Sequence, residues 1–250
     1  MTSPAILSTD RISRSFGGLT AVRDVTFALH VNELHAVIGP NGAGKSTFVN
    51  LLSGQLPPSK GRILLEGHDI TGTPAHRMAH LGVGRSFQRT NIMKSLSVLE
   101  NVRLAAQAVR LPATRIFSSA RRQTELIDIA RRALERVGLS GSEDTASGTL
   151  SHGAQRQLEI AMTLAISPKV LLLDEPLAGM GQEEGERIAI LLKSLARDHA
   201  VLLIEHDMDF VFKVADQMTV LVEGAVLATG RPGDVRANAA VQSAYLGGHA

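Results

Sequence analysis

The sequence predicts an α/β fold that is built on a parallel sheet and carries a small antiparallel β-lobe and an inserted helical subdomain. Continuous apolar runs alternate with helical patterns, as in parallel sheets that helices cover on both faces. The runs occupy residues 34–39, 170–174, 201–204 and 218–222. Because none of them alternates polar and apolar residues, we expect these strands to be buried on both faces.

Helical patterns lie beside these runs at residues 45–53, 154–166 and 182–197. Shorter strand candidates between glycine-containing turns, at residues 5–8, 25–30 and 62–66, predict the antiparallel lobe. Apolar residues at spacings of three and four predict helix in the middle of the chain: Leu126, Ala130, Ala133 and Val137. We expect a single domain over residues 1–250, with a core at 1–94 and 149–250 and a helical subdomain at about 95–148.

Bulk composition excludes several classes of protein. The chain has 250 residues, a formal net charge of +2 and 0 cysteines, so a disulfide framework and a cysteine metal site are both impossible. The small net charge gives no support for nucleic-acid binding, which concentrates Lys and Arg on one face. No apolar run approaches the ~20 residues of a membrane-spanning helix. No secretory signal is visible, so we expect a soluble protein that reaches a membrane only through a partner.

The predicted helical subdomain also carries a face rich in arginine, namely Arg121, Arg122, Arg131, Arg132 and Arg136. One interpretation is a solvated helix face. The other is a surface that meets acidic partner segments or lipid headgroups, and the sequence leaves both open. Gly138 is expected to end this helix.

Residues 39–47 read GPNGAGKST, which matches the phosphate-binding pattern G-x-x-x-x-G-K-[ST] of a P-loop. Gly42 and Gly44 allow a tight turn whose backbone N–H groups can surround phosphate oxygens. Lys45 offers a positive charge to the β- and γ-phosphates, Ser46 offers a hydroxyl to Mg²⁺, and the following helix offers its positive N-terminus. The nucleotide-binding set predicted here is Gly39, Pro40, Asn41, Gly42, Ala43, Gly44, Lys45, Ser46 and Thr47.

Acidic and imidazole side chains end two further apolar runs. Asp174 and Glu175 end VLLLDE, which places them at the carboxyl end of a strand, where α/β sheets bind ligands. We expect Asp174 to hold Mg²⁺ through water, and Glu175 to act as general base for an attacking water. His206 in LLIEHD occupies the position expected of a γ-phosphate sensor. Spacing alone classes Gln88 in SFQR as a surface residue.

The segment from Leu150 to Gln157 reads LSHGAQRQ and resembles the LSGGQ signature of ABC ATPases. With GPNGAGKST, SFQR, VLLLDEP and LLIEHD it forms the ordered motif set of that P-loop NTPase family, spread over essentially the whole chain. Finer features resemble the LivG-type ATP-binding subunits of importers for branched-chain amino acids, amides and urea. These features are SFGGLTAV, GVGRSFQRTNIMKSLSVLENV, LSHGAQRQLEIA, EPLAGMG and AYLGG.

The resemblance implies ATP and Mg²⁺ as ligands and assigns further roles. Phe16 would stack on adenine, where many relatives use Tyr, and Val22 would flank the nucleotide. Gln88 would link Mg²⁺ and the attacking water to the helical subdomain. Ser151 and Gly153 would contact the γ-phosphate of an ATP held by a second subunit.

Three positions depart from the family pattern. His152 replaces the first glycine of the signature pair, which the branched-chain group tolerates. Ala154 stands where relatives carry Gln or Glu, so one polar contact of the signature is missing. Gly181 stands where many ABC ATPases carry an aspartate, so communication between two sites would rely on backbone contacts there.

The resemblance implies the ATP-hydrolysing motor of an importer for branched-chain amino acids or related small polar substrates. Its expected partners are transmembrane permease subunits, a second ATP-binding subunit that is identical or related, and, indirectly, an extracytoplasmic substrate-binding protein. The expected location is the cytoplasmic face of a bacterial-type inner membrane, without nucleic acid as a partner. The alternatives are an ATPase of the lipopolysaccharide-export type and a soluble, non-transport ABC ATPase.

Overall fold

The computed structural model describes residues 4–86, 91–110 and 120–246, excepting the side chains of residues 120–122 and 245–246. Its centre is a six-stranded sheet with the strand order β10-β9-β3-β8-β7-β6. The strands of this sheet are β3 (Leu34–Ile38), β6 (Val83–Arg85), β7 (Val170–Asp174), β8 (Ala200–Ile204), β9 (Gln217–Val222) and β10 (Ala225–Gly230). All pairs are parallel except β9 with β10, which form an antiparallel hairpin at one edge.

The predicted antiparallel lobe forms a second sheet, with the order β2-β1-β4-β5. Its strands are β1 (Ala5–Phe16), β2 (Leu19–His30), β4 (Lys60–Leu65) and β5 (His68–Asp69). The first two strands are longer than the sequence predicts, because the parts missed, residues 9–16 of β1 and 19–24 of β2, mix polar with apolar side chains and form no continuous apolar run. Register shifts near Arg11, which has a φ of 46°, also bend this hairpin.

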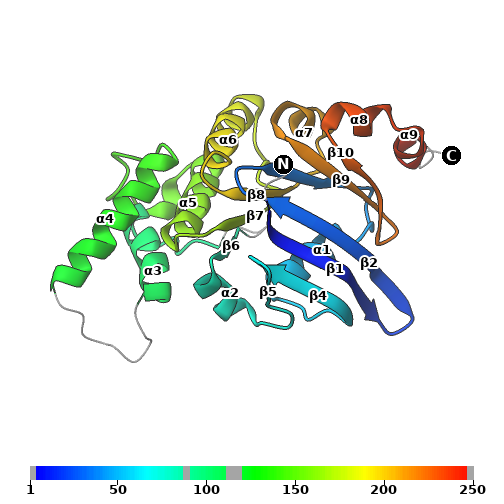
Figure 1. Cartoon of the computed structure of the whole chain (residues 1–250). Helices are drawn as coiled ribbons and strands as arrows, with labels where there is room; N and C mark the ends of the chain where they lie inside the picture. The colour runs from blue at the N-terminus through cyan, green and yellow to red at the C-terminus, as the bar shows by residue number, and fades with distance from the viewer. Residues whose placement is uncertain (1–3, 87–90, 111–119, 247–250) are drawn as a thin grey trace.

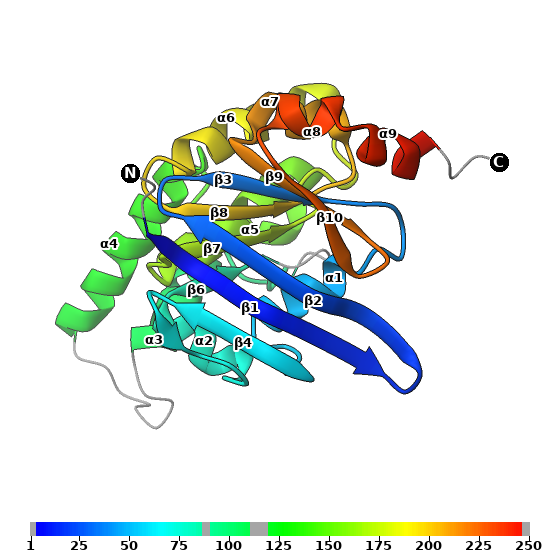
Figure 2. The same cartoon turned by 45° about the vertical axis from the view of Figure 1, so that its right-hand side comes forward.

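The parallel sheet is buried on both faces, as the apolar runs predict. Along β7, Leu171 and Leu173 join the core beneath the helical part of the molecule. Val170 and Leu172 point to the opposite face and join the core that helix α1 (Lys45–Leu52) and the antiparallel sheet complete. Figure 1 shows α3, α4 and α5 gathered at one side of the molecule, and Figure 2 shows the long β1–β2 hairpin over α1.

Two predicted helices start or end within a few residues of their expected bounds. Helix α5 (His152–Ala165) begins before the predicted Ala154, because Ser151 Oγ accepts a hydrogen bond from the Ala154 N–H at 3.2 Å and caps the helix. Helix α6 (Gln182–Leu195) begins where the pattern predicts. The other helices are α2 (Ala75–Leu81), α3 (Val98–Arg110), α4 (Ala120–Arg136), α7 (Met208–Val214), α8 (Pro232–Ala237) and α9 (Ala239–Leu246).

The arginine-rich face of α4 is at least partly paired on the surface. Arg131 Nε lies 3.1 Å from Glu143 Oε2, and Arg136 Nη1 lies 2.8 Å from Asp198 Oδ2. Within the described ranges, no helix is both long and apolar enough to cross a bilayer.

Helices α3 and α4 pack against α5, and one buried amide ties α3 to the chain on both sides of it. Asn101 Oδ1 accepts from the Met93 N–H at 2.8 Å, and Asn101 Nδ2 donates to the carbonyls of Met93 at 3.2 Å and Ser97 at 2.9 Å. Nδ2 also donates to Ser147 Oγ at 3.2 Å. Asn101 is 1% exposed, so these partners cannot turn to water when the amide is lost.

Replacing Asn101 with Asp keeps the shape of this side chain but removes its donors. We expect Asn101→Asp to lower the free energy of unfolding by about 1–3 kcal/mol, because buried carbonyls lose their partner. Urea unfolding measures the change. Asn238→Asp is the matched control, since Asn238 uses only its oxygen there, accepting from the Ala240 N–H at 2.9 Å on the surface. Equal stability of the two variants would contradict the role given to the Asn101 amide.

Candidate nucleotide site

The carboxyl ends of four neighbouring parallel strands meet at one edge of the sheet. In the order β3, β8, β7 and β6, the chain continues from these strands into Gly39, Glu205, Glu175 and Ser86. The register places Val37 beside Ile204, and Ile204 beside Asp174. The P-loop, the pair Asp174 and Glu175, and His206 therefore lie side by side, although they are far apart in the sequence.

Backbone geometry explains why the P-loop needs glycine. Gly44 has a φ of 96°, and a Cβ built there would lie 2.3 Å from the carbonyl oxygen of Ala21. Gly39 is equally restricted, since its Cβ would lie 2.2 Å from the carbonyl oxygen of Leu221. Gly42 has a φ of 81° but open space around it, so its constraint is backbone conformation alone.

The loop leads directly into α1, whose first residues are Lys45, Ser46 and Thr47. Their N–H groups have no acceptor within the helix and point out of its N-terminus, where the helix dipole favours an anion. Ser46 is exposed on this surface. Pro40, Asn41 and Ala43 complete the turn, in which the Ala43 N–H donates to the Pro40 carbonyl at 3.1 Å.

Lys45 is folded back into its own loop. Its Nζ donates to the carbonyl of Gly39 at 2.6 Å and to that of Pro40 at 3.1 Å. Burial lowers the pKa of Lys45, and attraction to Glu175 and Asp174 opposes that change. The ammonium group therefore lies in the field of both acids and is held by two carbonyls that a phosphate can replace.

Asp174 is buried at the end of β7, with 6% of its surface exposed. Burial raises the pKa of Asp174, and the guanidinium of Arg85 opposes the rise. Asp174 and Ser46 offer carboxylate and hydroxyl oxygens, the ligand type that Mg²⁺ prefers. No group of three or more His, Cys, Asp or Glu side chains suited to a metal occurs in the part of the chain that the structure describes. One carboxylate and one hydroxyl fit Mg²⁺, which keeps several waters and takes one or two carboxylates plus substrate phosphates.

Glu175 turns away from the strand that carries Asp174. It has a φ of 47°, a left-handed conformation that is uncommon outside glycine, and its N–H donates to the Ile204 carbonyl at 2.9 Å. The half-buried carboxylate lies 3.9 Å from Nδ1 of His206, measured at Oε1. The imidazole is 66% exposed and stands at the rim of the site. The structure thus brings Glu175 and His206 together, as their strand positions predict.

The signature residues make their contacts elsewhere. Ser151 Oγ lies 3.3 Å from Glu184 Oε1, and a Cβ on Gly153 would lie 2.5 Å from the same oxygen. Ser151 and His152 are exposed at the N-terminus of α5. This end of the helix therefore faces Glu184 on α6 and the surface.

The remaining predicted residues differ in accessibility. Phe16 is 44% exposed at the end of β1, with the Arg14 guanidinium 4.8 Å from its ring centroid, so one face of the ring is covered by a cation. Val22 does not reach the site surface, because its side chain is fully buried at 0% exposure in the core under the antiparallel sheet. The prediction that Val22 flanks the nucleotide is therefore not supported by its position. Gln88 lies outside the described residues.

Two residues that the sequence analysis did not single out fix the backbone at and just after Asp174 and Glu175. Arg156 donates from Nη2 to the carbonyls of Asp174 at 3.1 Å and Glu175 at 2.8 Å, and from Nη1 to Glu159 at 2.5 Å. The signal in the sequence is a basic residue next to the signature motif, in a helix whose buried face it shares. Arg156 is only 5% exposed, which the pattern alone cannot show.

The second is Glu205, which is 1% exposed. Its carboxylate accepts from the Leu177 N–H at 3.0 Å and from the His206 N–H at 3.3 Å. Burial raises the pKa of Glu205, and these two hydrogen bonds oppose the rise. An acid at the end of an apolar run, in LLIEHD, is the signal that could have identified it.

Comparison with protein families gives two matches. Residues 22–178 match the family described as ABC transporter. Residues 225–250 match the family described as branched-chain amino acid ATP-binding cassette transporter.

Similar curated proteins include two bacterial transport proteins. The chain is 38% identical to the high-affinity branched-chain amino acid transport ATP-binding protein BraF of Pseudomonas aeruginosa, over 98% of this chain and 99% of that protein. It is 39% identical to the corresponding protein LivG of Escherichia coli, again over 98% of this chain and 99% of that protein. Among solved structures, an ATP-binding cassette of an ABC transporter in its ADP conformation is similar with a TM-score of 0.85 and 29% identity, covering 98% of this chain and 100% of that one.

The position of Lys45 gives a test of phosphate binding by the P-loop. We expect Lys45→Ala to weaken the binding of a fluorescent ATP analogue severely, because Lys45 is the positively charged side chain that GPNGAGKST supplies to a phosphate. Fluorescence titration measures the affinity. Lys60→Ala is the control, since Lys60 is exposed at the start of β4 and should leave the affinity unchanged. Normal binding by Lys45→Ala would show that the phosphates bind elsewhere.

Proposed function

Since the chain belongs to the ABC transporter family of ATP-binding proteins, we propose that it is the ATP-binding and ATP-hydrolysing subunit of an importer. The proposed cargo is a branched-chain amino acid or a related small polar substrate. The observation that carries this proposal is similarity over nearly the whole chain to BraF and LivG, whose names state branched-chain amino acid transport. The convergence of the P-loop, Asp174 and Glu175 at one sheet edge supports it.

In the proposed reaction, the P-loop binds the triphosphate of ATP through its N–H groups and Lys45. Phe16 offers the uncovered face of its ring to adenine. Glu175 accepts a proton from a water that attacks the γ-phosphorus in line, the bond from that phosphorus to the bridging oxygen breaks, and ADP leaves. His206 donates a hydrogen bond to the γ-phosphate. Ser46, Asp174 and Gln88 would hold Mg²⁺, which offsets the charge of the phosphates when it is bound.

A second subunit completes each site in this proposal. Ser151, exposed at the N-terminus of α5, and Gly153, which is buried beside Glu184, would meet the γ-phosphate of an ATP bound to the partner, which is identical or related. The N-terminal helix dipole adds to that contact. Glu184 must move away from Ser151 Oγ for this to happen, since a carboxylate and a phosphate repel each other at that distance.

The proposal extends to transport. Closing and opening of the pair would move the helical subdomain at about residues 95–148 relative to the core, and so act on transmembrane permease subunits. An extracytoplasmic binding protein would deliver the substrate to that permease. The chain would then sit at the cytoplasmic face of the membrane as a peripheral subunit.

The relatives also bear on the alternatives. BraF and LivG favour import of amino acids over lipopolysaccharide export, and over a soluble ABC ATPase without a transport role. Neither alternative has an observation of its own in the part of the structure described here.

The assignment of Glu175 as general base gives a kinetic prediction. We expect Glu175→Gln to bind ATP as the wild type does and to lose roughly 10²–10⁴-fold in turnover, because the amide cannot accept the proton. Phosphate release and ATP-analogue binding are measured on the same preparation. Glu183→Gln, at an exposed position of α6, is the control and should retain turnover. Hydrolysis by Glu175→Gln at the wild-type rate would remove Glu175 as the base.

Affinity purification from detergent-solubilised membranes tests the transport role. We expect a permease and a second ATP-binding subunit to co-purify with the tagged chain and to be identified by mass spectrometry. Ligand binding by the associated extracytoplasmic protein would then identify the cargo. Recovery of ribosomes or DNA in place of a permease would favour the soluble alternative.

A further inference from the structure

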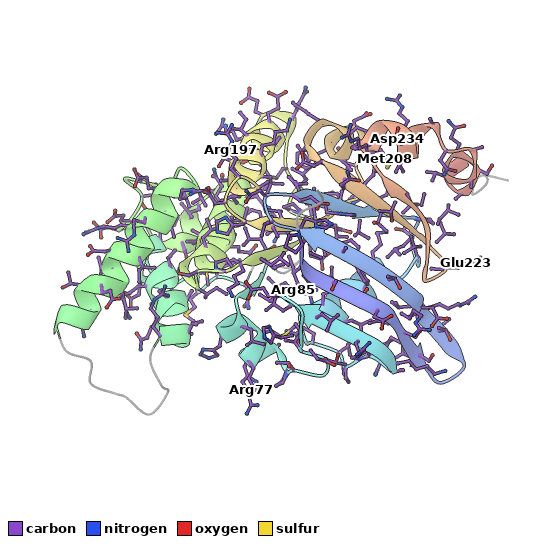
Figure 3. The ribbon with its side chains drawn as sticks, viewed as in Figure 1. Arg77, Arg85, Arg197, Met208, Glu223 and Asp234 are labelled. Atoms are coloured by element: carbon purple, nitrogen blue, oxygen red, sulfur yellow. The ribbon has the colours of Figure 1, made fainter. Side chains whose placement is uncertain are left out.

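Arg85, the last residue of β6, forms a buried ion pair with Asp174 at the candidate nucleotide site. Its Nη2 lies 3.1 Å from Asp174 Oδ2. The two side chains are only 10% and 8% exposed. In Figure 3 Arg85 lies in the middle of the molecule, whereas Arg77 projects from its outline. The sequence analysis does not single out Arg85. The residue ends a short strand, three residues before Gln88, and matches no position of the predicted site.

The guanidinium contacts three side chains on two other elements at once. While Nη2 contacts Asp174 on β7, Nη1 donates to Asn50 Oδ1 at 2.7 Å and to Ser53 Oγ at 2.7 Å. Asn50 lies in α1, the helix that starts at the P-loop, and Ser53 is its C-cap residue. Arg85 therefore connects the acid at the end of β7 to the helix whose other end binds phosphate.

Charge explains why such a group is needed. A carboxylate as buried as that of Asp174 is unstable without a positive partner or several donors. Lys45 is engaged by carbonyls of its own loop, at 2.6 and 3.1 Å. Arg85 is the cation that contacts the carboxylate in the described structure, and it leaves further lone pairs of that carboxylate for other ligands.

We propose that Arg85 is a positioning residue for Mg²⁺: its guanidinium holds the Asp174 carboxylate against α1, so that the acid is oriented before the ion and the triphosphate arrive. The proposal rests on the proposed function, in which Asp174 contributes to the Mg²⁺ site. Side chains that orient a metal-binding group act on metal affinity even though they do not touch the metal.

The shape of the contact requires arginine. A guanidinium donates in a fixed plane and serves the carboxylate, the amide and the hydroxyl together, whereas a lysine ammonium is a compact point charge on a flexible stem. Arg85→Lys keeps the charge but cannot serve all three acceptors in this geometry. Arg85→Met keeps much of the length and removes both charge and donors. The two variants therefore separate charge from geometry.

The test measures binding of a fluorescent ATP analogue in EDTA and across a Mg²⁺ titration, without relying on hydrolysis. We expect Arg85→Met to bind the analogue in EDTA as the wild type does. Its half-maximal Mg²⁺ concentration should rise about 10- to 100-fold, the range seen when a group that orients a metal ligand is lost. The half-maximal Mg²⁺ concentration of Arg85→Lys should fall between those of the wild type and Arg85→Met. Thermal unfolding of every variant is measured in parallel.

Arg62→Met is the matched control. Arg62 Nη2 also lies 3.1 Å from a carboxylate oxygen, that of Asp10, but the arginine side chain is 62% exposed and distant in the fold, on β4. We expect this variant to keep the wild-type Mg²⁺ dependence. The comparison separates loss of any arginine–carboxylate pair from loss of this one.

The outcomes distinguish the two proposals. A wild-type protein whose ATP binding ignores Mg²⁺ would contradict the proposed function, whatever Arg85 does. A Mg²⁺-dependent wild type with an unchanged Mg²⁺ midpoint in Arg85→Met would overturn the role of Arg85 alone, even if the variant melts earlier. If Arg85→Met does not fold, Arg85→Lys decides: a raised midpoint supports the proposal and a wild-type midpoint overturns it.

Discussion

Parallel pairing of β3, β8, β7 and β6 is the constraint on which the candidate site depends. The register sets Val37, Ile204 and Asp174 side by side, so the chain leaves three strands at the same level. Parallel strands need crossover segments, which is why these positions come from distant parts of the sequence. Without that register, the P-loop and the two acids would be separate motifs with no common chemistry.

Charges at this edge are compensated within the protein itself. Carbonyls hold Lys45, Arg85 holds Asp174, and N–H groups hold Glu205. Arg156 donates hydrogen bonds to the backbone carbonyls of Asp174 and Glu175. Buried polar groups that are satisfied in this way keep a defined geometry, and a low-polarity surrounding strengthens their interactions. A ligand therefore meets groups that are already oriented, which is the arrangement that favours electrostatic catalysis.

The same geometry separates the two halves of the proposed ATP site. Groups that would bind and cleave the triphosphate lie along the sheet edge, whereas Ser151 and Gly153 lie at the start of α5 beside Glu184. In the proposed pair, this capped helix N-terminus, at which Ser151 is exposed, would supply its contact to the other subunit. In that pair, neither chain would carry a complete site alone, so the two subunits would act together.

The sequence by itself determined the parallel core, the P-loop and the acids, because continuous apolar runs and residue spacing are local properties. It underestimated β1 and β2, whose residues 9–16 and 19–24 mix polar with apolar side chains, and the family resemblance placed the fully buried Val22 beside the nucleotide. The division into core and helical subdomain and the roles of the site residues stay predictions. Only the tertiary structure decided which charges meet: Arg85 reaches Asp174, and Arg156 reaches the backbone of Glu175, through contacts between distant segments. No local pattern encodes such pairs, because they depend on sheet order and register.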